Sequence, residues 1–129
     1  MLSGKILVVD DDTDILEVVG MILRKHGFEP VTFSSPPINF VEEIMEINPA
    51  VILLDVQLGR YDGRALGKRI KEVKMLMHIP VILFSANNHF KYDIATYLCD
   101  DFIEKPFGVD FFIDMISYYV QKLQRKDIG

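Results

Sequence analysis

Short, unbroken apolar runs that end in an acidic residue constrain the fold of this chain most strongly. Residues 6–9 read Ile-Leu-Val-Val before Asp10, and residues 51–54 read Val-Ile-Leu-Leu before Asp55. A strand that is buried on both faces of a parallel sheet has this continuous apolar character, whereas a half-exposed strand alternates. Parallel neighbours need a long crossover connection, which is usually a helix. The runs therefore predict an α/β fold.

Strands and helices are predicted in strict alternation along the chain. We expect strands at 5–9, 28–33, 50–54, 79–84 and 101–104, and helices at 13–26, 36–47, 64–74, 88–98 and 109–124. In the second helix, Ser35 is the expected N-cap, with Pro36 or Pro37 in the first turn. This order predicts a (βα)5 doubly wound parallel sheet of five strands, covered by helices on both faces. No repeat or linker interrupts it, so we expect one domain over residues 1–129.

Polar residues gather where the predicted strands end. Five of them follow four strands: Asp10, Asp11, Asp55, Ser85 and Lys105. In open α/β sheets this carboxyl edge carries the ligand. Each residue alone has an ordinary explanation, such as a solvated turn, a helix cap or a surface lysine. Neighbouring carboxylates repel one another unless a cation lies between them, so together the set indicates Mg²⁺ (or Mn²⁺) beside one reactive aspartate.

These motifs, in their order and spacing, resemble the receiver (response-regulator) domain of two-component signalling. The similarity runs from about Lys5 to Leu123, and the matching segments are 6–12, 51–55, 62–63, 80–86 and 100–107. The resemblance implies a flavodoxin-like receiver topology and a phosphorylation-dependent switch in a two-component system or phosphorelay. Such a chain is not an enzyme in the usual sense, because it catalyses only its own phosphorylation and dephosphorylation.

The resemblance implies an acceptor and a set of metal ligands. Asp55 would accept the phosphoryl group from a histidine kinase or a phosphotransfer protein and form an aspartyl phosphate. Asp11 would bind Mg²⁺ directly, and Asp10 would bind it mainly through water. Asp55 itself and the backbone carbonyl of Gln57 would complete the protein ligands.

The resemblance also assigns residues around the phosphoryl group. Ser85 would donate a hydrogen bond to it, and Lys105 would pair with its charge. Phe102 occupies the switch-aromatic position, where an aromatic side chain turns inward as Ser85 moves; the alternative is that Phe102 is ordinary strand packing. Gln57 and Asn87, two residues beyond the acceptor and Ser85, are expected to influence the lifetime of the aspartyl phosphate.

Three features depart from the family pattern. Gly59 stands where the family usually has a proline, four residues after the acceptor, and gives that loop more freedom. Leu98-Cys99 stand where the family often has Gly-Ala, so the preceding helix lacks its usual glycine C-cap. The segment between Ser85 and Lys105 is short, which leaves the length of the fourth helix open.

The last predicted helix carries a second apolar stripe beside the one that faces the sheet. This stripe follows helical spacing and consists of Phe111, Met115 and Tyr118. Receivers commonly place polar residues there, so the stripe is expected to bind a downstream protein or a second copy of the chain, as a homodimer. The surface would comprise the fourth helix, the fifth strand and the fifth helix. The alternative is that the stripe packs under the C-terminal tail or loops.

Composition and the terminal sequence exclude several other classes. The net charge is -5 and no Lys/Arg cluster is present, so we expect no direct nucleic-acid binding. Cys99 is the only cysteine, which excludes a disulfide framework and a thiolate metal site. No signal-peptide pattern and no apolar stretch of membrane-spanning length occur, so a cytoplasmic protein without membrane insertion is expected.

Two other functions are alternatives to the switch. A small Mg²⁺-dependent phosphatase of the haloacid-dehalogenase type needs Asp-x-Asp, but Asp55-Val56-Gln57 lacks the second aspartate. A phosphorylation-independent receiver that acts as a protein-interaction module is the stronger alternative, and retention of all five polar residues argues against it. The chain is expected to be either a stand-alone receiver or a fragment of a larger regulator.

Overall fold

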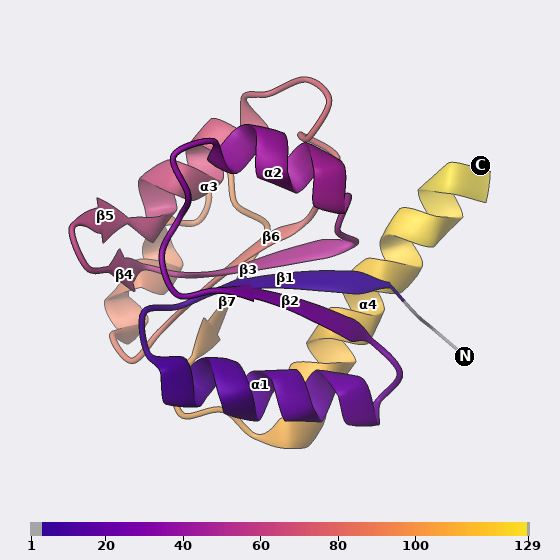
Figure 1. Ribbon diagram of the computed structural model, residues 1–129, viewed down its shortest axis with the longest axis horizontal. Coiled ribbons are helices and arrows are strands. Elements are labelled where there is room, and N and C mark those ends of the chain that lie inside the picture. Colours follow the sequence, from indigo (N-terminus) through magenta and orange to yellow (C-terminus); the bar gives the residue numbers. More distant parts are fainter. Residues whose placement is uncertain (1–3, 129) are drawn as a thin grey trace.

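Five parallel strands form one sheet in the order β2-β1-β3-β6-β7, with helices on both faces (Figure 1). The computed structural model describes residues 4–128. The strands of the sheet are β1 (Lys5–Val9), β2 (Glu29–Phe33), β3 (Val51–Asp55), β6 (Val81–Ser85) and β7 (Asp101–Glu104). The helices are α1 (Thr13–Lys25), α2 (Phe40–Ile47), α3 (Gly63–Lys71) and α4 (Val109–Ile128). The predicted doubly wound α/β architecture is confirmed.

The sheet separates two hydrophobic cores. Helices α1 and α4 cover one face, and α2 and α3 cover the other (Figure 1). Alternate residues of one strand serve the two cores: Ile6 and Val8 pack on the first side, and Leu7 packs on the second. Because helices cover both faces of the sheet, the side chains of β1 that enter either core are apolar. This explains the unbroken apolar run in the sequence.

The central strands are the most deeply buried elements. Residues 6–9, 51–54 and 81–84 have no exposed surface. Strand β1 pairs with β3 so that Val9 lies opposite Leu54. The residues that follow these strands therefore leave the sheet side by side at its carboxyl edge.

Helix α2 begins later than predicted. Asn39 is its N-cap and makes no side-chain capping bond, so the expected cap at Ser35 is wrong. The two prolines account for the delay, because a residue that precedes proline is disfavoured in helical conformation. Pro36 restricts Ser35, and Pro37 restricts Pro36, which disfavours a helix that starts at Pro36; the helix begins at Phe40.

The prediction of an α-helix over 88–98 is wrong. The chain forms a short 3-10 helix, η1 (Asn88–Asp93), followed by turns up to Leu98. Leu98 ends the segment with φ 61°, the left-handed conformation that a glycine would adopt at lower cost. No residue of η1 is buried, and helices depend mainly on a buried face for their stability.

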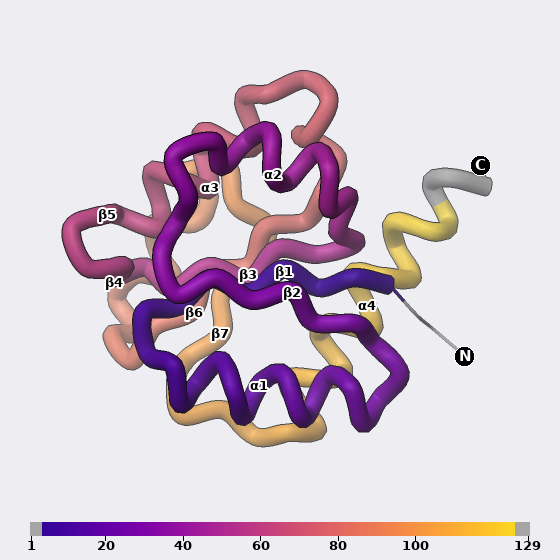
Figure 2. The backbone as a smooth tube through the Cα atoms, viewed as in Figure 1, coloured from indigo at the N-terminus to yellow at the C-terminus, as the bar shows by residue number. Residues whose placement is uncertain are grey.

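A small hairpin occupies the loop predicted after β3. It pairs β4 (Gln57–Leu58) with antiparallel β5 (Tyr61–Asp62), and Gly59 in its turn has φ 60°. Figure 2 shows this hairpin and the segment after β6 at the same end of the sheet. Within residues 4–128, none of the helices combines the length and apolar character that a bilayer span requires.

Candidate functional site

Three carboxylates meet at the carboxyl edge of the sheet. Asp10 and Asp11 follow β1, and Asp55 ends β3. One oxygen from each lies within 4.8 Å of the others. Asp10 is fully buried and Asp55 is 6% exposed, whereas Asp11 is exposed. The adjacency of β1 and β3 brings together residues that are remote in the sequence.

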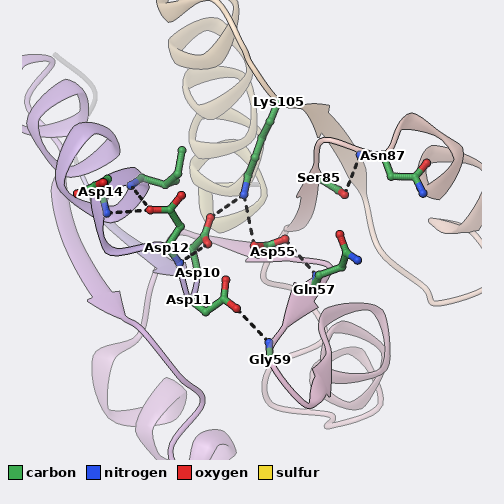
Figure 3. A network of polar contacts seen from close by, with 11 residues as sticks. Asp10, Asp11, Asp12, Asp14, Asp55, Gln57, Gly59, Ser85, Asn87 and Lys105 are labelled. Atoms are coloured by element: carbon green, nitrogen blue, oxygen red, sulfur yellow. Dashed lines mark hydrogen bonds and ion pairs between the residues drawn. The ribbon is translucent and has the colours of Figure 1, made fainter.

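Lys105 reaches this cluster from the loop after β7 (Figure 3). Its Nζ lies 2.8 Å from Asp10 Oδ2 and 3.3 Å from Asp55 Oδ2. The Lys105 N–H donates to the Ser85 carbonyl at 2.9 Å, which joins the loop to the neighbouring strand. The peptide bond to Pro106 is cis. The ammonium is thus shared between the two buried carboxylates.

The electrostatic balance of the cluster remains negative. Burial raises the pKa of Asp55 most, and the adjacent Asp10 raises it further, to about 6 from 3.8. The Gln57 N–H, which donates to Asp55 Oδ1 at 3.1 Å, and the Lys105 ammonium act in the opposite direction. Three carboxylates face one ammonium here, so a divalent cation would relieve the repulsion. Their oxygen ligands suit Mg²⁺.

Ser85 ends β6 and lies across Asp55 from Asp10 and Asp11 (Figure 3). It is 1% exposed, and its Oγ accepts a hydrogen bond from the Asn87 N–H at 3.0 Å. The Asn87 side chain accepts from the His89 N–H at 3.0 Å and caps η1. This capping role was not anticipated, although Asn is a common N-cap.

The sequence comparisons assign the family. A profile for the "Response regulator receiver domain" matches residues 6–117. The chain belongs to the response regulator receiver family. The Escherichia coli (strain K12) transcriptional regulator NtrC is 29% identical over 134 residues, covering 99% of this chain and 28% of NtrC. Chemotaxis protein CheY of Bacillus subtilis is 28% identical over 116 residues, covering 90% of this chain and 97% of CheY.

Solved structures agree with the sequence relationship. The receiver domain of a histidine kinase from Syntrophus aciditrophicus has a TM-score of 0.83 and 26% identity, covering 95% of this chain and 93% of that domain. This receiver spans only about a quarter to a half of several curated relatives, as for NtrC with 28% and the phosphate regulon regulator PhoB with 47%.

The hairpin after β3 contacts the exposed acidic residue of the receiver. The Gly59 N–H donates to Asp11 Oδ2 at 3.2 Å, a contact between residues 48 positions apart (Figure 3). A proline has no N–H and could not form it. The departure from the family pattern at Gly59 thus supplies a donor that holds Asp11, which no local sequence signal indicated.

Gly63 contacts the backbone of the receiver's Asp55. A Cβ at Gly63 would lie 1.9 Å from the Asp55 carbonyl oxygen and 2.8 Å from its carbon. The Gly63 N–H donates to the Val56 carbonyl at 2.7 Å. Asp62-Gly63 matches the family pattern, but the sequence alone indicates no role for this glycine. The structure shows that only glycine fits between α3 and β3 here.

The remaining predicted residues occupy different environments. Phe102 is half-buried on β7 and packs against the core under α2 and α3. Burial raises the pKa of Cys99 to about 12, and nearby Asp100 adds to the shift, so this thiol is a packed residue and no activated nucleophile. In α4, Phe111 and Tyr118 are exposed, whereas Met115 is half-buried and packs on the core with α1.

Proposed function

We propose that this receiver is a phosphorylation-dependent signalling switch that accepts a phosphoryl group on Asp55. The observation that carries the proposal is the buried Asp55 carboxylate. It contacts the Lys105 ammonium, and one of its oxygens lies within 4.8 Å of a carboxylate oxygen of Asp10 and of Asp11. The expected donor is a phosphohistidine of a histidine kinase or a phosphotransfer protein. A carboxylate oxygen of Asp55 attacks phosphorus, the phosphorus–nitrogen bond breaks, and the histidine leaves.

The residues around Asp55 have different roles in the proposed phosphoryl transfer. Lys105 pairs with a phosphoryl oxygen, and Ser85 donates a hydrogen bond to another. Asp10, Asp11 and Asp55, with the backbone carbonyl of Gln57, would hold Mg²⁺. When bound, Mg²⁺ neutralises charge on the carboxylates and on the phosphoryl oxygens. The receiver domain of the Pseudomonas aeruginosa sensor histidine kinase PA1611, which shares the fold, has a magnesium ion coordinated in its active-site cleft.

Phosphorylation is proposed to act through Ser85 and Phe102. Ser85 moves towards the phosphoryl group, and Phe102 turns inward into the space that is vacated. The half-buried position of Phe102 on the strand next to β6 supports this role, because the side chain is neither locked in the core nor free in solvent. One charged modification then biases a two-state element.

The direct test is the intact mass of the protein after incubation with acetyl phosphate, with Mg²⁺ and with EDTA. We expect a gain of one phosphoryl group that depends on Mg²⁺, because the metal offsets the negative charge of the site. No gain under either condition would contradict the switch and favour a phosphorylation-independent interaction module.

Gln57 and Asn87 are proposed to set the lifetime of the aspartyl phosphate. Both side chains lie two residues beyond a site residue and can hydrogen-bond an attacking water without supplying charge. Since the Asn87 side chain also caps η1, Asn87→Ser keeps a capping oxygen while removing the amide. We expect the decay rate of phosphorylated protein to change in Gln57→Ala and Asn87→Ser; unchanged decay in both would refute the role.

The exposed part of the second α4 stripe is proposed to bind a downstream protein or a second copy of the chain. Phe111 and Tyr118 are each 56% exposed on this face of α4. Charged residues at either position would oppose burial in an interface. We expect Phe111→Glu and Tyr118→Glu to weaken dimerisation or partner binding at least about tenfold, while the melting temperature stays unchanged. Glu substitution of exposed Val18 on α1 is the matched control, and equal binding by all variants would exclude this face.

A further inference from the structure

Arg64, the second residue of α3, contacts two acidic and two aromatic side chains at once. Its Nη2 lies 2.9 Å from Asp62 Oδ2, and its Nη1 lies 2.6 Å from Asp93 Oδ2. The same guanidinium lies 4.7 Å from the ring centre of Phe90 and 5.1 Å from that of Tyr97. We call the contacts with Phe90, Asp93 and Tyr97 the Arg64 clamp, because all three partners belong to the segment after β6.

The segment 88–98 has few other anchors. No residue of η1 is buried, and Phe90 and Ile94 are only partly buried against the core. Regions with few buried apolar contacts open at low free-energy cost. The Arg64 and Asp93 side chains are 23% and 35% exposed, so their ion pair is partly shielded from solvent. The Arg64 clamp therefore provides a large share of the contacts that hold this segment.

The clamp connects both sides of the Asp55 site. Gly63, the residue before Arg64, lies against the Asp55 carbonyl with no room for a methyl group. The clamped segment begins just after Asn87, whose N–H donates to Ser85 Oγ and whose side chain caps η1. One end of the clamp is thus fixed to the acceptor strand, and the other end leads to the Ser85 hydroxyl.

We propose that Arg64 is a positioning residue that holds the Ser85–Asn87 loop in its resting arrangement. The inference rests on the proposed function, in which Ser85 moves towards a phosphoryl group on Asp55. Asn87 is bonded both to Ser85 and to η1, so in this proposal the movement of Ser85 also displaces the clamped segment. The Arg64 clamp resists the displacement and so slows phosphorylation of Asp55.

Two variants weaken the clamp without removing bulk from the fold. Arg64→Lys keeps the positive charge but lacks the planar fork that contacts two carboxylates and two rings together. Asp93→Asn keeps the shape of the side chain and removes the negative charge that pairs with Arg64 on α3. Arg69→Lys is the matched control, because Arg69 is exposed on the same helix.

The experiment measures the initial rate of phosphorylation by acetyl phosphate with Mg²⁺, together with amide hydrogen exchange of residues 90–97. We expect both clamp variants to phosphorylate faster than the wild type, between about 2-fold and 30-fold, and to exchange faster in this segment. Arg69→Lys should match the wild type in both measurements. A purely structural Arg64 would change exchange or melting temperature but not the rate.

The outcomes separate this inference from the proposed function. If the wild type is phosphorylated and both clamp variants react at its rate or more slowly, the inference is overturned. If the wild type takes up no phosphoryl group, the proposed function fails. Faster exchange in both variants would then still support the restraint on residues 90–97, and unchanged exchange would overturn it.

Discussion

Replacing Asp55 with asparagine is expected to abolish phosphorylation and, in the absence of metal, to stabilise the fold. The amide has no nucleophilic carboxylate oxygen, so no acyl phosphate can form. The same change removes a buried negative charge that lies beside Asp10, while Lys105 keeps its 2.8 Å contact with Asp10. Relief of this repulsion should raise the free energy of unfolding by about 1–2 kcal/mol.

Urea denaturation in EDTA and in Mg²⁺, with intact mass after acetyl phosphate, checks both parts. Mg²⁺ should stabilise the wild type more than Asp55→Asn, because a ligand that binds the folded state more tightly stabilises it more. Asp114→Asn, on the exposed side of α4, is the control and should change stability by less than about 0.5 kcal/mol. Uptake of a phosphoryl group by Asp55→Asn would place the acceptor elsewhere, and a less stable variant would show that the carboxylate is not under repulsion.

Gly63→Ala is expected to be among the most destabilising single substitutions in the protein. The added methyl carbon would lie 1.9 Å from the Asp55 carbonyl oxygen, far inside van der Waals contact, and the opposing atom belongs to a buried backbone that cannot rotate away. Either α3 or β3 has to shift, and the Gly63–Val56 hydrogen bond is lost or lengthened. We expect a loss of about 3 kcal/mol or more.

Gly108→Ala provides the matched control for this substitution. Nothing lies within 4 Å of a Cβ at Gly108, which precedes α4. The change there should stay below about 1 kcal/mol, since only the small cap and chain-entropy effects operate. Chemical denaturation of both variants gives the comparison. A loss below about 1 kcal/mol in Gly63→Ala would mean that α3 moves away from β3 at little cost, contrary to the close packing described above.

The polar cluster was predictable because its carboxylates stand directly after strands that the sequence pattern predicts. Asp10 and Asp55 each follow an unbroken apolar run, and parallel strands present their carboxyl ends at one edge. The structure brings these carboxylates and Lys105 into contact, as the sequence pattern suggested. The family profile over residues 6–117 agrees with the resemblance drawn from the same motifs.

Helix boundaries were less predictable where tertiary contacts compete with local preference. The segment 88–98 has the length of a helix, but it lacks a buried face and closes through Leu98 in a left-handed conformation. The late start of α2 at Phe40 follows from two successive prolines, whose effect on the preceding residues outweighs the capping preference of Ser35.

The sequence by itself determined the α/β fold and the residues of the candidate site, because buried parallel strands impose a hydrophobic pattern that is local along the chain. Only the tertiary structure decided how that site is supported. Gly59 reaches Asp11 across 48 positions, and Arg64 reaches Asp93 across 29. Such contacts depend on how separate loops pack in space. No local sequence pattern shows which distant residue a glycine N–H or an arginine side chain will contact.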